Sequence, residues 1–366
     1  MIYIIKKMYE AFGNYIDTSY ELRGVTPFIT PSIEINSNDY PDSNDTIKSL
    51  ELASSIHKEV RRTLQPQLKP GIKLNDIAKI IEQKTIELSN QSKSINKGIG
   101  FPVGLSINHC AAHYHPLPTD QTILTKSDII KIDFGTEVNG WIVDSAFTIC
   151  FDPKYDDLME AVKEGTNTGI KNIGVDVNIG EWGGLIQEVI ESYEISLNNQ
   201  ILPIKSIKNL GGHNIVKGII HGGTFLPAFK MDTTNKFKEG VYAVETFCST
   251  GATILSEVGD STLFRLNPNN TNISNLKLDT TKNLLYKIKK SFETLPFTNR
   301  YCEIFNINNI NNINNYATHL KLLTNSNCIH QYPPLCANVG DMTAQYEHTV
   351  YINETNKIVF SKGDDY

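Results

Sequence analysis

The chain has 366 residues, of which 40% are hydrophobic and 20% are charged, and its formal net charge at pH 7 is -6. This composition is typical of a soluble globular protein, and the acidic balance excludes an overall basic surface for nucleic acid. No stretch reaches the roughly 20 apolar residues of a membrane span, and the apolar N-terminal run is too short for a secretion signal. The six scattered cysteines form no CxxC pair and indicate the reduced thiols of an intracellular protein, so we expect a cytoplasmic location.

Residues 1–45 show no periodicity and predict an irregular N-terminal leader. From Asp45, apolar residues recur at helical spacing as far as Leu64, and Pro66 ends the pattern. A second amphipathic stripe runs over 74–86, with Asn75 as the expected N-cap.

A similar unit follows about a hundred residues later. Residues 158–170 predict a helix, 174–177 a turn and 182–189 another helix. Each helix pair lies next to strand-like segments that carry an acidic residue. This weak internal duplication predicts an α+β fold with helices packed on one face of a curved antiparallel sheet.

The character of the chain changes after residue 258. Asn-rich tracts at 267–270 and 306–313 flank a helical pattern over 284–292, which predicts a helical insertion with polar loops. We therefore expect a leader over 1–45, a main α+β domain formed by 46–258 and 335–366, and an insertion subdomain over 259–334.

Two strand-like segments, 129–135 and 140–147, are joined by Asn139-Gly140, which favours a two-residue hairpin turn. With that turn, Asp133 and Asp144 are diagonal neighbours on one face, about 7–8 Å apart at most. Two carboxylates directed at one point from apolar strands repel each other, and a shared cation would neutralise both. The alternative is that both are solvated at a sheet edge.

Two further acids, Glu245 and Glu347, lie in the middle of strand-like runs. Either residue alone would be expected on a solvent-facing side of its strand. Four acids in four apolar strands are harder to explain in that way and favour a metal site.

Histidines add to this pattern in two groups. Three lie within 109–115, and His213 and His221 each stand beside glycines that permit close backbone approach. Neutral imidazole is a good ligand for borderline metals and the usual proton carrier near neutral pH. A single histidine is more often structural than functional.

Ordered motifs from about residue 47 to the end match one family. These motifs are Gly100–Gly104, Asn108–Tyr114, Lys131–Gly135, Asn209–His213, Ile220–His221, Glu245–Phe247, Tyr332–Cys336, Thr343–Thr349 and Gly363–Tyr366. By these motifs the chain resembles the type 2 methionine aminopeptidases of peptidase family M24.

The resemblance implies a "pita-bread" fold of the α+β class, with two pseudo-symmetric halves, a curved antiparallel sheet and a helical type 2 insertion. It also implies two divalent metal ions per subunit, drawn from Mn²⁺, Co²⁺, Fe²⁺ or Zn²⁺. The implied metal ligands are Asp133, Asp144, His213, Glu245 and Glu347. In the family the first Asp chelates one ion, the His and the first Glu bind the other, and the remaining two acids bridge.

The implied activity is removal of the initiator methionine from nascent proteins and peptides, with a preference for a small second residue. The implied catalytic residues are His113, His221 and Glu245, with Glu245 as proton shuttle and both histidines also contacting substrate. An apolar pocket for the methionine side chain is expected from Phe101, Ile220, Phe247, Tyr332 and Leu335.

The expected partners are nascent polypeptide N-termini and fumagillin-type inhibitors, with no membrane and no specific nucleic acid. The charged N-terminal extension of eukaryotic type 2 enzymes is not found in residues 1–45, so at most a transient ribosome contact is expected.

Two alternatives stay open at this point. A Xaa-Pro aminopeptidase or prolidase of the same fold usually carries a large separate N-terminal domain, whereas here there is room only for a short leader. A non-enzymatic pita-bread binding protein would have lost metal ligands, whereas all five are present in this sequence.

Overall fold

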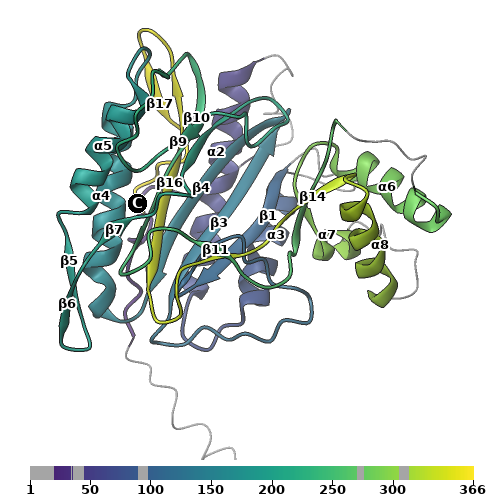
Figure 1. Ribbon diagram of the computed structural model, residues 1–366, viewed down its shortest axis with the longest axis horizontal. Coiled ribbons are helices and arrows are strands. Elements are labelled where there is room, and N and C mark those ends of the chain that lie inside the picture. The colour runs from purple at the N-terminus through teal and green to yellow at the C-terminus, as the bar shows by residue number, and fades with distance from the viewer. Residues whose placement is uncertain (1–19, 34, 36–44, 90–97, 270–275, 305–312) are drawn as a thin grey trace, which may run out of the picture.

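The computed structural model describes residues 20–33, 35, 45–89, 98–269, 276–304 and 313–366. Two antiparallel sheets lie side by side in its centre (Figure 1). The first has the order β1-β3-β4 and consists of β1 (Gly98–Ile107), β3 (Ile129–Val138) and β4 (Trp141–Cys150). The second has the order β17-β16-β10-β8-β9, with β7 beside β10, and consists of β7 (Lys205–Ser206), β8 (Gly212–Ile215), β9 (Phe225–Leu226), β10 (Gly240–Ser249), β16 (Thr343–Ile352) and β17 (Lys357–Val359).

Side-chain hydroxyls join the two sheets where β4 runs beside β16. Thr148 Oγ1 donates to the carbonyl of Gln345 at 2.7 Å and accepts from its N–H at 2.8 Å. Thr349 Oγ1 makes the same two bonds with the backbone of Asp144, both at 2.7 Å. The sheets therefore form one continuous curved surface, as predicted.

Helices cover one face of this surface. The first pair, α2 (Thr46–Leu64) and α3 (Leu74–Leu88), packs on the first sheet, and α4 (Asp156–Asn172) packs on β10 and β16 with α5 (Ile179–Ile190) against it. Short 3-10 turns η2 (Gln65–Gln67) and η3 (Pro153–Tyr155) adjoin α2 and α4. The two halves repeat one plan, so the α+β prediction and its internal duplication are confirmed.

Helix α2 shows why the sequence folds this way. The carboxylate of Asp45 accepts a hydrogen bond from the N–H of Lys48 at 3.1 Å and caps the helix. Leu50, Ile56 and Leu64 share its inner face and are fully buried. Burial of such side chains contributes about 1.5–3 kcal/mol each to folding.

The predicted N-cap of α3 is wrong. Lys73 occupies the N-cap position, and Asn75 lies inside the first turn. The amide of Asn75 donates to the carbonyls of Leu117 and Asp120 at 2.8 and 2.6 Å and accepts from Arg300. A loop packed on the helix start uses the side chain that would otherwise cap the helix.

The segment 259–334 differs from a purely helical insertion. It contains α6 (Asp279–Phe292), α7 (Asn299–Ile304) and α8 (Ile313–Asn325), and also a small sheet of order β13-β12-β14. The strands of that sheet are β12 (Leu263–Leu266), β13 (Phe297–Thr298) and β14 (Ile329–Tyr332). They have only two to four residues, too few to show an alternating pattern. The predicted apolar stripe of α6 is buried as expected.

Smaller elements complete the described chain. A third sheet has the order β11-β15-β2, and a hairpin joins two outer strands; these elements are β2 (Cys110–Ala112), β11 (Ser256–Glu257), β15 (Leu335–Cys336), β5 (Glu194–Leu197) and β6 (Gln200–Pro203). Over 20–33, the leader forms an isolated bridge to β4 through Arg23 and no helix or strand. Residues 1–19, most of 34–44 and the Asn-rich run 306–312 lie outside the described residues. Among the described helices, none combines the length and hydrophobicity that crossing a membrane requires.

Candidate metal centre

The hairpin of β3 and β4 has the predicted register. Gly135 pairs with Asp144 and Asp133 with Ala146, and the turn residues Asn139 and Gly140 have φ angles of 55° and 85°. Both angles lie in the left-handed region that a type I′ turn requires. Asp133 and Asp144 therefore project from the same face of the first sheet.

The second sheet supplies the remaining candidates. Glu245 on β10 lies directly opposite Glu347 on β16, and His213 on β8 pairs with Ala243 on β10. A Cβ atom on the neighbouring Gly212 would lie 2.4 Å from the carbonyl oxygen of Ala243. Only glycine therefore lets β8 approach closely enough to bring His213 into the group.

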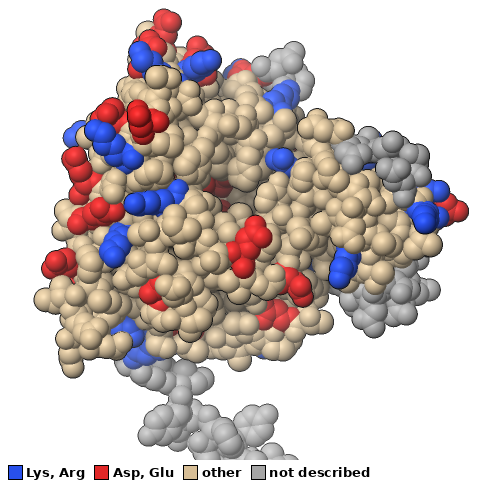
Figure 2. All heavy atoms as spheres, in the orientation of Figure 1, with Lys and Arg blue, Asp and Glu red and all other residues tan. Residues whose placement is uncertain are grey.

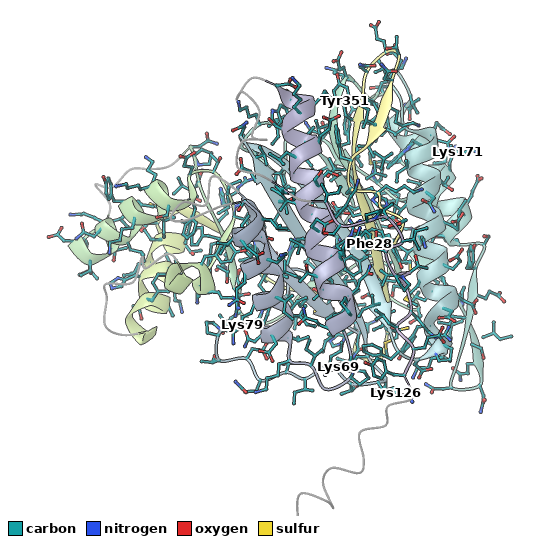
Figure 3. All side chains as sticks on the ribbon, turned by 180° about the vertical axis from the view of Figure 1, so that it is seen from behind. Phe28, Lys69, Lys79, Lys126, Lys171 and Tyr351 are labelled. Carbon is teal, nitrogen blue, oxygen red and sulfur yellow. The ribbon has the colours of Figure 1, made fainter. Side chains whose placement is uncertain are left out.

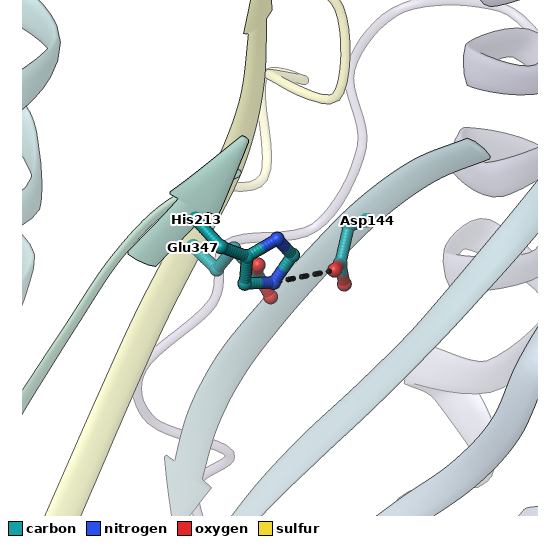
Figure 4. A group of neighbouring side chains, drawn as sticks. All are labelled: Asp144, His213 and Glu347. Carbon is teal, nitrogen blue, oxygen red and sulfur yellow. Dashed lines mark ion pairs between the residues drawn. The ribbon is translucent and has the colours of Figure 1, made fainter. Parts of the chain in front are cut away.

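The five predicted ligands lie in one cluster, and Figure 4 shows three of them, Asp144, His213 and Glu347. Ligand atoms of Asp144, His213 and Glu347 all lie within 4.8 Å of one another. His213 Nε2 lies 3.6 Å from Asp144 Oδ2 and 3.7 Å from Glu245 Oε1. The amide of Gln345 reaches Glu245 Oε2 at 3.1 Å and Asp133 Oδ2 at 3.4 Å, which places Asp133 in the same cluster.

These carboxylates have too few protein partners for their charge. Glu347 is 1% exposed, yet neither of its carboxylate oxygens has a hydrogen-bond partner in the described structure, and Asp133 Oδ1 also has none. Burial raises the pKa of Asp133 to about 7. Burial, reinforced by the neighbouring acids, holds the pKa values of Asp144, Glu245 and Glu347 well above their ordinary range.

Bound cations would remove this deficit, because they supply the unpaired oxygens with a partner and offset the mutual repulsion. Four carboxylates and one imidazole form an oxygen-rich donor set. Such a set suits Mn²⁺, Fe²⁺ or Co²⁺ better than a thiolate-bound structural zinc. The residues present therefore fit a divalent metal centre.

The cluster forms one wall of a cavity of about 390 Å³. Figure 2 shows a hollow between the main body and the α6–α8 lobe, with acidic side chains in its depth. The lining includes all five candidate ligands and most of the predicted substrate residues: His113, His221, Phe101, Ile220, Phe247 and Tyr332. Leu335 does not line the cavity; it pairs with Ala112 on β2 and packs in the cluster that contains Phe247, behind the wall.

The two predicted catalytic histidines both reach the cavity. His113 is half-buried, has a φ of 66°, and its ring meets that of Tyr332 edge-on with 6.1 Å between centroids. Burial lowers the pKa of His113 to about 4, so its ring is neutral near pH 7. The exposed ring of His221 lies edge-on to His213 at 4.3 Å.

Further polar residues line the cavity and were not predicted as site residues, among them Gln345, Lys131 and His115. Gln345 stands two residues before Glu347, so strand alternation could have placed both on one face. Lys131, two residues before Asp133, is buried and donates to the carbonyl of Asn108 at 2.9 Å. Leu263 and Pro296 reach the cavity from the insertion, and no local pattern indicates that packing.

Comparisons with known proteins identify the family of the chain. A family model described as Metallopeptidase family M24 matches residues 48–258. Methionine aminopeptidase 2-2 of Aspergillus terreus is 44% identical over 330 residues, which cover 88% of this chain and 73% of that protein.

Two solved structures share the fold. A thermophilic Arx1 gives a TM-score of 0.68 at 19% identity, with 87% of this chain and 90% of that one covered. Methionine aminopeptidase from Rickettsia prowazekii gives 0.55 at 16% identity, with 88% and 99% covered. The structural likeness establishes the pita-bread fold alone, whereas the family match and the identity to the Aspergillus terreus enzyme show that the chain belongs to metallopeptidase family M24 and, within it, to the methionine aminopeptidase 2 group.

Proposed function

We propose that this protein is a metal-dependent methionyl aminopeptidase that removes the initiator methionine from nascent proteins and peptides, with a preference for a small second residue. The observation that carries the proposal is the convergence of four carboxylates, two of them with buried oxygens that have no partner in the described structure, and His213 on the wall of a single cavity. Membership of the methionine aminopeptidase 2 group supplies the reaction class.

Two divalent ions are proposed for this centre, with Mn²⁺, Co²⁺, Fe²⁺ and Zn²⁺ as candidates. Asp133, Asp144, His213, Glu245 and Glu347 would hold these ions. Divalent metal supplies a Lewis acid that polarises a peptide carbonyl and makes water a nucleophile at neutral pH.

The protein side chains would hold and move the proton. Glu245 Oε2 accepts from Gln345, which leaves Oε1 as the oxygen that can take a proton from the attacking water and return it to the leaving amine. His113 and His221 face the same cavity, where they can donate hydrogen bonds to the developing negative charge and to the leaving amide.

The methionine side chain would occupy the apolar part of the cavity, formed by Phe101, Ile220, Phe247 and Tyr332. Leu335 is left out of this set because it packs behind the wall. We assign the leader to 1–45, the catalytic domain to 46–258 with 335–366, and an insertion subdomain to 259–334, supported by the separate sheet β13-β12-β14.

Nascent polypeptide N-termini are the proposed partners, in the cytoplasm and with at most a transient ribosome contact. Fumagillin-type epoxides are proposed to react with His113, which lines the cavity.

The test is a peptide panel with metal-free protein and added Mn²⁺ or Co²⁺. We expect Met release from Met-Ala-Ser, none of comparable rate from Met-Pro, Ala-Pro or Leu-Ala, and inhibition by fumagillin. Cleavage of Ala-Pro, which has no N-terminal methionine, would instead indicate a prolidase-like enzyme. A folded protein that releases no Met with any metal would reject the enzyme.

Metal should also stabilise the fold in a pH-dependent way. At one hundred times its dissociation constant, one bound ion raises the free energy of unfolding by about 2.7 kcal/mol. Protons compete with the metal for carboxylates of raised pKa, such as Asp133 at about 7, so we expect a smaller gain at pH 5.5 than at pH 8. Thermal unfolding with and without Mn²⁺ measures this gain, and an equal gain at both pH values would contradict binding at the acidic cluster.

A further inference from the structure

The residues that follow three proposed ligands point to the opposite face of the sheets, because side chains alternate along a strand. They are Phe134, Ser145 and His348. Ser145 Oγ donates to the carbonyl of Glu347 at 2.7 Å and so ties β4 to β16 at the level of the ligands. This rear face is packed against α2 and the last residues of the chain.

A buried polar group occupies that position, and we call it the tail cluster: His57, Arg61, Ser361, Asp365 and Tyr366. Arg61 is its centre, and its guanidinium donates twice to the carboxylate of Asp365, at 2.8 Å each. Arg61 Nη1 also faces Ser361 O at 2.9 Å, and Tyr366 Oη and His57 Nδ1 at 3.2 Å. The side chains of Arg61 and Asp365 are both 0% exposed.

The tail cluster contacts the rear of β3, β4 and β16, the strands that carry Asp133, Asp144 and Glu347. His57 Nε2 lies 2.9 Å from the carbonyl oxygen of Phe134, and the two rings stack at 3.9 Å. Tyr366 Oη bonds Ser145 Oγ at 2.8 Å, and its ring stacks on His348 at 5.0 Å. The guanidinium of Arg61 is planar, so its N–H donors point in fixed directions. Arg61 therefore holds His57, Asp365 and Tyr366 in fixed positions relative to one another.

The leader closes the tail cluster from outside. Thr26 N–H donates to the carbonyl of Asp365 at 3.0 Å, and the N–H groups of Ile29 and Thr30 donate to Asp364 Oδ2 at 2.9 and 2.6 Å. Phe28 lies beside α2 (Figure 3), with the Arg61 guanidinium 5.7 Å from its ring centroid. Excluding water in this way strengthens the Arg61–Asp365 pair.

We propose that the tail cluster is a positioning device that sets the spacing of Asp133, Asp144 and Glu347 on the cavity face. The inference rests on the proposed function, because it concerns residues assigned there to the metal. Crowded carboxylates push their strands apart, and the bonds to Phe134 O and Ser145, together with the Ser145–Glu347 bond, oppose that displacement. Supporting contacts of this kind orient ligands and tune metal affinity.

The experiment titrates metal-free protein with Co²⁺ by calorimetry and by visible absorption, beside thermal unfolding. Asp365→Asn removes the charge that pairs with Arg61, and Tyr366→Phe removes only the hydroxyl that bonds Ser145. The matched control is Glu82→Gln, because Glu82 on α3 forms a second buried pair with an arginine, Arg300 on α7, at 3.0 Å.

Both Asp365→Asn and Glu82→Gln are expected to lower the melting temperature. Of these two variants, Asp365→Asn alone should raise the Co²⁺ dissociation constant, by about tenfold, and shift the Co²⁺ spectrum. Tyr366→Phe removes two hydrogen bonds, with Ser145 and Arg61, but no charge; it should raise the constant about threefold and lower the melting temperature less than Asp365→Asn does. If Asp365→Asn does not fold, Tyr366→Phe alone tests the positioning role.

Unchanged Co²⁺ affinity and spectrum in Tyr366→Phe, or an equal loss in Glu82→Gln, would overturn the positioning role. Failure of the wild-type protein to bind Co²⁺ would instead overturn the proposed metal centre, so the two failures are distinguishable.

Discussion

Replacing Glu347 with Gln is expected to lower Met release by at least about a hundredfold, the upper range for loss of a residue that merely supports a ligand. Glu347 is a proposed metal ligand, and neither of its carboxylate oxygens has a hydrogen-bond partner in the described structure. Met-Ala-Ser hydrolysis and Mn²⁺ titration measure the loss. Wild-type activity at low Mn²⁺ would remove Glu347 from the centre.

The same variant should make the metal-free protein more stable. Burial and the neighbouring acids raise the pKa of Glu347 well above its ordinary value of 4.5. The folded state then binds this proton more readily than the unfolded state, so the contribution of Glu347 to stability is present at low pH and is lost as pH rises above 4.5 through the folded pKa. Gln does not titrate and escapes this loss.

We therefore expect Glu347→Gln to match the wild type near pH 4.5 and to exceed it at pH 8 by about 1–2 kcal/mol, the usual gain when a functional site is relieved of strain. Denaturant unfolding in chelator measures the difference. Comparison of the two proteins at each pH cancels the opposing titration of the buried histidines. A variant less stable than the wild type at pH 8 would show that the acids do not repel one another as described.

Replacing His113 with Ala should leave metal binding intact and remove catalysis. We expect kcat/KM to fall about 10²–10³-fold, as when one donor to developing charge is lost. His113 lines the cavity but touches no metal in the proposed arrangement. Steady-state kinetics with Met-Ala-Ser and calorimetry with Co²⁺ separate the two effects.

His109→Ala is the matched control for this variant. His109 lies in the turn before β2, its backbone carbonyl accepts from the N–H of Ala337, and it is not part of the cavity lining. Its replacement should leave kcat/KM within a few fold of wild type. A similar loss in both variants would assign the His113 effect to the loop rather than to the imidazole.

Features that depend on residues close together in the sequence were predicted correctly. The Asn139-Gly140 turn fixed the register that places Asp133 and Asp144 on one face, and the mid-strand positions of Glu245 and Glu347 proved correct. The helical stripes of α2 and α4 are present because one buried face repeats every three to four residues.

Contacts between residues far apart in the sequence could not be predicted from local patterns. His213 joins Asp144 only because Gly212 lets β8 approach β10, and nothing near Asp144 in the sequence records that contact. The apolar side chain of Leu335 suggested a pocket residue, but it packs behind the cavity wall. Strand β15 has only two residues, so strand alternation could not predict which way this side chain points. Asn75 shows the same limit, because its partners lie in a distant loop.

Anomalous scattering from crystals grown with Mn²⁺ would locate the bound metal ions. We expect two Mn²⁺ peaks enclosed by Asp133, Asp144, His213, Glu245 and Glu347, both absent from Glu347→Gln crystals grown at low Mn²⁺. Mn²⁺-dependent Met release from a protein whose Mn²⁺ binds elsewhere, with no peak at these side chains, would contradict the proposed metal centre.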